Sequence, residues 1–110
     1  MKTFRTLDLA VTYYELAEKI RITGNLRDQL LRAASSIALN LAEGNAKSSV
    51  KEKKRYYQTA YASLKECETV LKLVKTEDSI IIQTTNHLGA SLYKLMNSSI
   101  SVKDTRKNQR

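Results

Sequence analysis

The stretch RAASSIALNLAEG, residues 32–44, decides the fold of this chain. Its apolar residues recur every four positions: Ala33, Ile37 and Leu41. This spacing is typical of the buried face of an α-helix. Glycine weakens a helix and is common just after its last turn, so Gly44 is expected to close this one. The stretch therefore predicts a helix over about residues 26–43 that packs one side against the rest of the protein.

Polar side chains accompany this apolar face. Ser36, Asn40 and Glu43 follow one another at helical spacing, and burial of such groups costs free energy unless each has a hydrogen-bond partner. A second helix should therefore supply partners, and the segment ASLKE at residues 62–66 contains suitable ones. We predict a hydrogen-bonded network that fixes the register of two helices, formed by Arg32, Ser36, Asn40, Glu43, Ser63 and Glu66.

Three further helices follow from apolar residues at three- and four-residue spacing. The first, over about residues 6–22, is expected to turn six residues inward: Leu7, Ala10, Val11, Tyr14, Ala17 and Ile20. Gly24 is expected to end it and Asn25 to cap the next helix. Ser49 and Glu52 form a capping box that starts another helix, and the last helix begins near Asp78.

These helices define the fold class. Proline, which breaks helices, is absent, and a chain of 110 residues is long enough for one core. Short connections make successive helices antiparallel, so we predict an all-α, up-down-up-down four-helix bundle over residues 1–101. Residues 102–110 carry four basic residues and one acid, and are expected to form a disordered basic tail.

Positive charge is the one compositional indication of a partner. The formal net charge is +8 and the sequence pI is about 9.7, which favours nucleic acid or another polyanion. The charge clusters at the start of the helix after Ser49, where cations oppose the helix dipole and add nothing to local stability. An outward tyrosine there can stack on an unpaired base. The predicted nucleic-acid-binding residues are Lys47, Lys51, Lys53, Lys54, Arg55 and Tyr56, and a merely solvated surface is the alternative.

The residues of this chain give little support for an enzymatic function. His87 and Cys67 lack the spacing of metal ligands, and Cys67 occupies a core position. Glu43 and Glu66 can be interpreted as paired carboxylates of a nuclease, but metal-binding bundles use Glu-x-x-His pairs and this chain has none. We therefore predict no catalysis, no metal and no cofactor. One cysteine, no long apolar run and no signal-like N-terminus predict a cytoplasmic protein without a membrane partner.

Two motifs together resemble a known family. RAASSIALNLAEG at residues 32–44 and AYASLKE at residues 60–66 are similar to the bacterial four-helix-bundle family of 23S rRNA intervening-sequence proteins, over about residues 4–97. The accessory variability determinant of diversity-generating retroelements is similar as well. The resemblance implies a barrel-shaped homopentamer with a basic surface, and for the retroelement relative it implies binding of nucleic acid and of a reverse transcriptase. Two departures are a short link at residues 23–25 without proline, and Leu31-Arg32 in place of an arginine pair.

Two functional hypotheses remain from the sequence. The first is a non-enzymatic, oligomeric bundle that binds RNA or DNA phosphates through its basic surface, as an accessory or scaffold protein. The second is a protein-interaction and self-assembly module with no nucleic-acid role. Both are compatible with the composition, because a basic surface also contacts acidic proteins.

Overall fold

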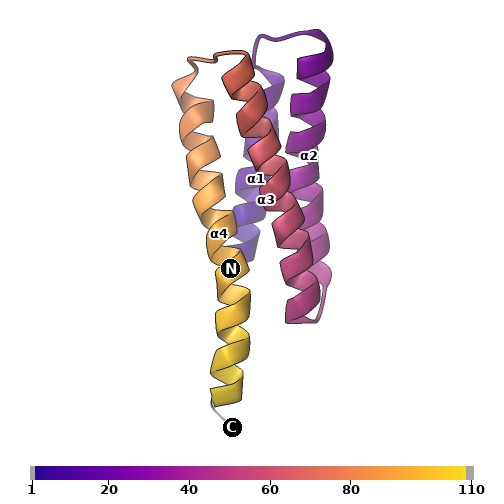
Figure 1. The fold of residues 1–110 in the computed structure, drawn as a ribbon, viewed down its shortest axis with the longest axis vertical. Coiled ribbons are helices and arrows are strands. Elements are labelled where there is room, and N and C mark those ends of the chain that lie inside the picture. Colours follow the sequence, from indigo (N-terminus) through magenta and orange to yellow (C-terminus); the bar gives the residue numbers. More distant parts are fainter. Residues whose placement is uncertain (1, 109–110) are drawn as a thin grey trace.

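The computed structural model is an antiparallel bundle of four helices (Figure 1). It describes the backbone of residues 2–108 and the side chains of residues 5–97. The helices are α1 (Lys2–Glu18), α2 (Gly24–Ala46), α3 (Val50–Leu73) and α4 (Ser79–Asn108). The described residues contain no strand, and the chain measures 54 × 21 × 20 Å along its principal axes. The predicted fold class and helix order are confirmed.

The four helices occupy the corners of a square. α2 and α3 form the closest pair, and α1–α2, α3–α4 and α1–α4 are the other neighbours, so α1 lies diagonally across from α3. The predicted inward residues of α2, Ala33, Ile37 and Leu41, are buried, and they form one continuous core with buried residues of α1, α3 and α4. The largest side chains with less than 2% of their surface exposed are Tyr13, Tyr57, Leu30, Ile37, Leu41, Leu64, Ile81, Leu88 and Leu92.

The inward face of α1 differs from the prediction at two positions. Tyr13 is fully buried where Tyr14 was expected, and Val11 is 46% exposed. Tyr13 and Tyr14 lie three and four residues after Ala10, so both satisfy helical periodicity and spacing alone cannot choose between them. The hydroxyl of buried Tyr13 is satisfied by a 2.8 Å hydrogen bond with Oγ1 of Thr85. Burial raises the pKa of Tyr13 well above its ordinary value.

The link between α1 and α2 also corrects the expected caps. α1 ends at Glu18, four residues before the expected end, and the residue that precedes α2 is Thr23, whose side chain makes no capping hydrogen bond. Asn25 lies inside the first turn of α2 and is not the cap. Gly24 has a φ of +68°, the left-handed conformation that glycine adopts at little cost. The Arg27 guanidinium donates to the carbonyl oxygen of Glu18 over 3.3 Å, so a side chain satisfies the end of α1.

The starts of α3 and α4 are fixed by side-chain caps. Oγ of Ser49 accepts from the backbone N–H of Glu52 over 3.1 Å, which confirms the predicted capping box. Oδ1 of Asp78 accepts from the backbone N–H groups of Ile80 and Ile81 over 3.0 and 3.1 Å. At its other end α4 continues to Asn108, where an irregular tail was expected from residue 102. Residues 102–108 contain neither glycine nor proline, so nothing there stops helix propagation; residues 109–110 lie outside the described part.

The α2–α3 seam and the candidate nucleic-acid interface

A polar contact joins α2 to α3 at mid-length. The hydroxyl oxygens of Ser36 and Ser63 lie 2.8 Å apart in a partly buried hydrogen bond. The Asn40 amide donates to the backbone carbonyl of Ser36 over 2.8 Å and to its hydroxyl oxygen over 3.0 Å. Within the described side chains, every buried nitrogen or oxygen atom has a hydrogen-bond partner. Three of the six predicted network members therefore meet in one place, across two helices.

The other three predicted members do not join this network. The Arg32 guanidinium donates instead to Gln29 on its own helix, over 3.0 Å. The Glu43 carboxylate lies 3.4 Å from Nζ of Lys47, and both Glu43 and Glu66 are exposed. Long side chains at the edge of a helix can extend into water. The short serine and asparagine side chains cannot, so they form hydrogen bonds with neighbouring protein groups. The network is thus Ser36, Asn40 and Ser63 alone.

Gly44 permits a close contact between α2 and α3. α2 continues through it to Ala46, so it does not end the helix as predicted, and it is buried. A Cβ atom at Gly44 would lie 2.8 Å from Cε1 of Tyr57 and 3.0 Å from Cβ of Tyr56. The Tyr57 hydroxyl donates to Oδ1 of Asn45 over 2.7 Å, which fixes the ring against α2. Only a residue without a side chain fits this contact unless the ring shifts.

Cys67 completes the contact between α2 and α3 at the other end. Its thiol lies 3.9 Å from the carbonyl oxygen of Leu30, and the side chain is fully buried. Burial raises the pKa of the Cys67 thiol to about 12. The thiol is therefore protonated near neutral pH and is poorly suited to nucleophilic chemistry. We call the whole contact, from Cys67 through Ser63 to Gly44, the α2–α3 seam.

Two of the predicted nucleic-acid-binding lysines are engaged within the chain. Nζ of Lys53 donates to the carbonyl oxygens of Asn45 and Gly44 over 3.2 and 3.4 Å, which satisfies the end of α2. Nζ of Lys47 pairs with Glu43 and lies 5.3 Å above the centroid of the Tyr56 ring. The hydrogen bond with Glu43, and then Tyr56, raise the pKa of Lys47. Tyr56 is half-buried under this lysine, so its ring is less free to stack on a base than predicted.

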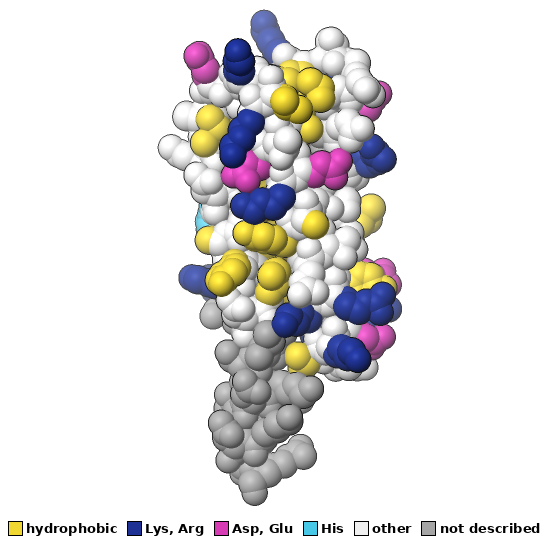
Figure 2. All heavy atoms as spheres, viewed as in Figure 1, with side chains coloured by type: hydrophobic (Ala, Val, Ile, Leu, Met, Phe, Trp, Pro, Cys, Tyr) yellow, Lys and Arg dark blue, Asp and Glu magenta, His cyan; other side chains and the backbone are white. Residues whose placement is uncertain are grey.

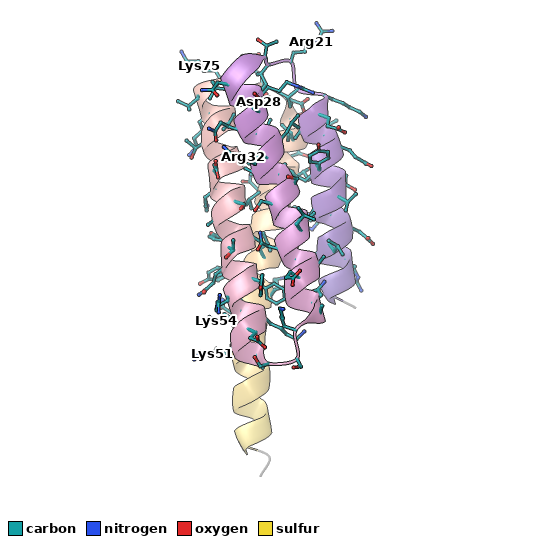
Figure 3. All side chains as sticks on the ribbon, turned by 90° about the vertical axis from the view of Figure 1, so that its right-hand side faces the viewer. Arg21, Asp28, Arg32, Lys51, Lys54 and Lys75 are labelled. Atoms are coloured by element: carbon teal, nitrogen blue, oxygen red, sulfur yellow. The ribbon has the colours of Figure 1, made fainter. Side chains whose placement is uncertain are left out.

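Three predicted cations remain without an internal partner. Lys51, Lys54 and Arg55 occupy positions i, i+3 and i+4 of α3, so they share one helix face. None of them takes part in an ion pair or side-chain hydrogen bond with the described residues. Figure 3 shows Lys51 and Lys54 together at the lower end of α3, pointing away from the bundle. Unpaired N–H groups at the start of α3 add positive potential there. We call these three residues the basic patch.

Further cations and the lone histidine lie outside the predicted cluster. Figure 3 shows Arg21 and Lys75 at the upper end of the bundle and Arg32 below them, whereas Lys51 and Lys54 lie at the lower end of α3. Arg21, Arg32 and Lys75 come from three separate segments of the chain. His87 is exposed and lines a groove of about 550 Å³ between α1 and α4. No cluster of three or more His, Cys, Asp or Glu residues that could hold a metal occurs in the described part of the chain.

The fold and the seam define a class of protein: a small all-α bundle whose motif residues join two helices and whose net charge is basic. The chain belongs to the 23S rRNA-intervening sequence protein family, whose pattern matches residues 4–101. A crystal structure from Bacteroides thetaiotaomicron, of a protein with unknown function from the S23 ribosomal protein family, has the same fold. The two share 19% sequence identity with a TM-score of 0.60, covering 93% of this chain and 97% of that one.

Two further findings are negative. No curated protein matches the chain at a significant level. None of the helices, over their described residues, has the length and hydropathy needed to cross a lipid bilayer.

Proposed function

We propose that this protein is a non-enzymatic bundle that binds structured RNA through phosphate contacts with Lys51, Lys54 and Arg55. The observation that carries the proposal is the contrast within one short segment: neighbouring lysines are engaged by the fold, while these three cations are exposed or half-exposed without a partner. Lys51 lies in the first turn of α3, where a cation opposes the helix dipole, so local helix stability does not explain it. Membership in the 23S rRNA-intervening sequence protein family favours RNA over other polyanions.

Self-association is part of the proposal because one protomer offers few phosphate contacts. Each phosphate neutralised on a duplex contributes about 0.9 to the slope of log K against log salt, so three cations bind only weakly. Several patches held in one assembly act together, which raises the apparent affinity without any new contact. We therefore propose a homo-oligomer, such as a pentamer, that acts as a scaffold or accessory factor for RNA.

The alternative, a self-assembly or protein-interaction module, rests on exposed apolar side chains. Leu39 is 69% exposed, Leu73 62% and Ile80 61%. Single exposed leucines are common on soluble proteins, so these residues alone do not define an interface. This alternative and RNA binding differ in one measurable property, the dependence of RNA affinity on the basic patch.

The test is a titration of structured RNA by fluorescence anisotropy at several salt concentrations. We expect the triple variant Lys51→Glu, Lys54→Glu, Arg55→Glu to bind at least about 100-fold more weakly and to show a shallower salt slope. The matched control is Lys19→Glu, Arg21→Glu, Lys94→Glu, which reverses three exposed charges elsewhere. If parent and both variants bind equally, or if the parent does not bind at low salt, RNA binding by the patch is wrong.

A further inference from the structure

The groove between α1 and α4, of about 550 Å³, has a charged end and an aromatic end. α1 and α4 run antiparallel, and the hydrogen bond between Tyr13 and Thr85 fixes their register. Arg5 and Lys94 therefore lie at one end of the groove, and His87 lies at the other. The wall from His87 to Lys94 rises by seven helical residues, so the two ends are about 10 Å apart.

Six polar side chains of this groove have no partner within the described part of the chain. Elsewhere, the exposed Thr59 and Thr84 direct their hydroxyls to the carbonyl oxygen four residues earlier, over 3.0 and 2.7 Å. In the groove, by contrast, the described structure gives no ion pair or side-chain hydrogen bond to Arg5, Asp8, Thr12, His87, Ser91 and Lys94. Polar groups that the fold does not use are available to a ligand.

The end of the groove at Arg5 and Lys94 suits a phosphate group. Both side chains are exposed, and Asp8, the acid of the lining, pairs with neither of them. Arg5 lies in the first turn of α1, where a cation opposes the helix dipole, so local helix stability does not explain it. Neighbouring cations also repel each other, and a bound anion offsets this repulsion. The arginine fork and the lysine ammonium are both common protein ligands of phosphate.

The rest of the groove suits a nucleoside. Its floor is apolar, because Leu95 is buried and Leu9 is half-buried. The His87 ring can stack on a nucleobase, as aromatic side chains do when they bind unpaired bases. Between the two ends, Asp8 and Ser91 offer a carboxylate and a hydroxyl to the hydroxyl groups of a ribose. The volume of about 550 Å³ falls within the usual range of small-molecule sites.

The face formed by α3 and α4 has a different pattern of charge (Figure 2). Basic and acidic side chains lie beside one another there, and Lys65 pairs with Glu68 over 3.3 Å. A carboxylate that neutralises a lysine weakens the attraction of that lysine for phosphate. α1 lies behind these two helices in Figure 1 and diagonally across from α3, so the α1–α4 groove is also separate from the basic patch.

We propose that the α1–α4 groove binds a free ribonucleotide. The phosphate lies between Arg5 and Lys94, the ribose contacts Asp8 and Ser91, and the base stacks on His87. Phosphate alone accounts for one end of the groove and a nucleoside for the other, whereas a nucleotide accounts for both. The proposal does not depend on RNA binding by the basic patch, because the two surfaces share no residue.

The test is isothermal titration calorimetry with probes that separate the parts of a nucleotide. We expect the protein to bind AMP, and to bind both ribose 5-phosphate, which lacks the base, and adenosine, which lacks the phosphate, more weakly. A tetraribonucleotide with a 5′-phosphate distinguishes a free nucleotide from the end of an RNA chain. It is measured in the triple variant of the basic patch, so that binding there does not contribute. Affinity no higher than that of AMP supports the free nucleotide, and higher affinity overturns it.

Two variants separate the ends of the groove. Arg5→Ala with Lys94→Ala should weaken binding of AMP and of ribose 5-phosphate at least about 10-fold, and leave adenosine unchanged. His87→Ala should weaken binding of AMP at least about 5-fold and leave ribose 5-phosphate unchanged. The matched control, Lys19→Ala with Arg21→Ala, removes one lysine and one arginine elsewhere and should bind AMP like the parent. All these positions are exposed, and circular dichroism establishes that each variant is folded.

Three outcomes overturn the proposal: a parent that does not bind AMP, a control that loses as much affinity as the groove variant, or an His87→Ala variant that weakens ribose 5-phosphate as much as AMP. These outcomes are distinct from those of the RNA titration. A protein that binds AMP in the groove but no RNA contradicts the proposed RNA role alone. A protein that binds RNA through the basic patch but no AMP contradicts the nucleotide site alone.

Discussion

The α2–α3 seam and the basic patch are both rich in polar residues, but they differ in where their partners lie. In the seam, Ser36, Asn40 and Ser63 satisfy one another within 3.0 Å. In the patch, Lys51 and Lys54 have no partner among the described residues. A polar sequence motif can therefore have a purely structural role, while nearby lysines without an internal partner remain available to bind a ligand.

Lys53 and Lys54 show the same difference between neighbours. Lys53 donates to two carbonyl oxygens at the end of α2, whereas Lys54 projects away from the bundle (Figure 3). The sequence gives no reason to separate them. Four experiments test whether the seam serves the structure and the patch serves binding, beginning with the largest expected effect.

Gly44→Ala should be the most damaging small change in the seam. The new Cβ would meet the buried Tyr57 ring at 2.8 Å, and overpacking of this kind costs about 1–3 kcal/mol, although helix propensity alone favours alanine. Chemical denaturation should show the loss in the free energy of unfolding. Gly89→Ala is the matched control, because its Cβ would meet only a leucine methyl at 3.3 Å. An equal loss in the free energy of unfolding at Gly44 and Gly89 would contradict the interpretation that the contact between Gly44 and Tyr57 is unusually tight.

Alkaline pH should weaken the seam through Cys67. Burial raises the pKa of this thiol to about 12 from 9.0, so above pH 9 the unfolded chain loses a proton that the folded chain keeps. Stability is therefore complete below pH 9 and falls as pH rises toward 12, by up to about 1.4 kcal/mol per unit. Urea unfolding at pH 8, 9.5 and 10.5 measures this slope. Cys67→Ala should have a shallower slope, and a parallel pH dependence in both proteins would refute the assignment.

Asn40→Leu should lower the free energy of unfolding by about 1 kcal/mol. It removes two hydrogen bonds to Ser36, each worth about 0.5–1.5 kcal/mol net, and part of this loss is offset by added apolar contact. The protein should remain helical, with altered melting or assembly and unchanged RNA affinity per assembled particle. A variant that melts and assembles like the parent but no longer binds RNA would place direct function in the seam.

Lys53→Met and Lys54→Met form the smallest and most discriminating pair. Lys53→Met removes the hydrogen bonds to the end of α2 and should cost about 0.5–1 kcal/mol of stability. Lys54→Met should change stability by less than about 0.5 kcal/mol but reduce the salt slope of RNA binding by about one. Thermal melting and RNA titration of both proteins measure the two effects. If the two variants have the same thermal stability and the same salt slope of RNA binding, the proposed difference between Lys53 and Lys54 is wrong.

Much of the fold follows from apolar periodicity and two capping signals. The buried residues of α2, α3 and α4 recur at regular spacing, and Ser49 and Asp78 mark helix starts by their chemistry. The serine–asparagine part of the seam was equally predictable, because short polar side chains beside an apolar stripe need partners. The polar residues of the segment ASLKE, residues 62–66, indicated the matching part of the second helix.

The failures share a physical cause, which is that one helix contains no information about its neighbour. Tyr13 and Tyr14 are equivalent by spacing, and the partner of the buried hydroxyl, Thr85, lies on α4, far away in sequence. Gly44 is a packing residue because Tyr57 lies opposite it, yet in sequence it looks like a stop signal. Arg32, Glu43 and Glu66 were predicted inside the seam because periodicity ignores the length and reach of a side chain.

The length of α4 and the slenderness of the bundle affect how the protein moves in solution. A particle of 54 × 21 × 20 Å has more friction than a sphere of equal mass, so it diffuses more slowly and tumbles anisotropically. On a sizing column such a protomer elutes early and imitates a larger globular protein. A closed homo-oligomer of these rods would be less elongated than one protomer, and its friction would be closer to that of a sphere. Sedimentation velocity, which reports mass and friction together, therefore distinguishes a stretched monomer from a closed assembly.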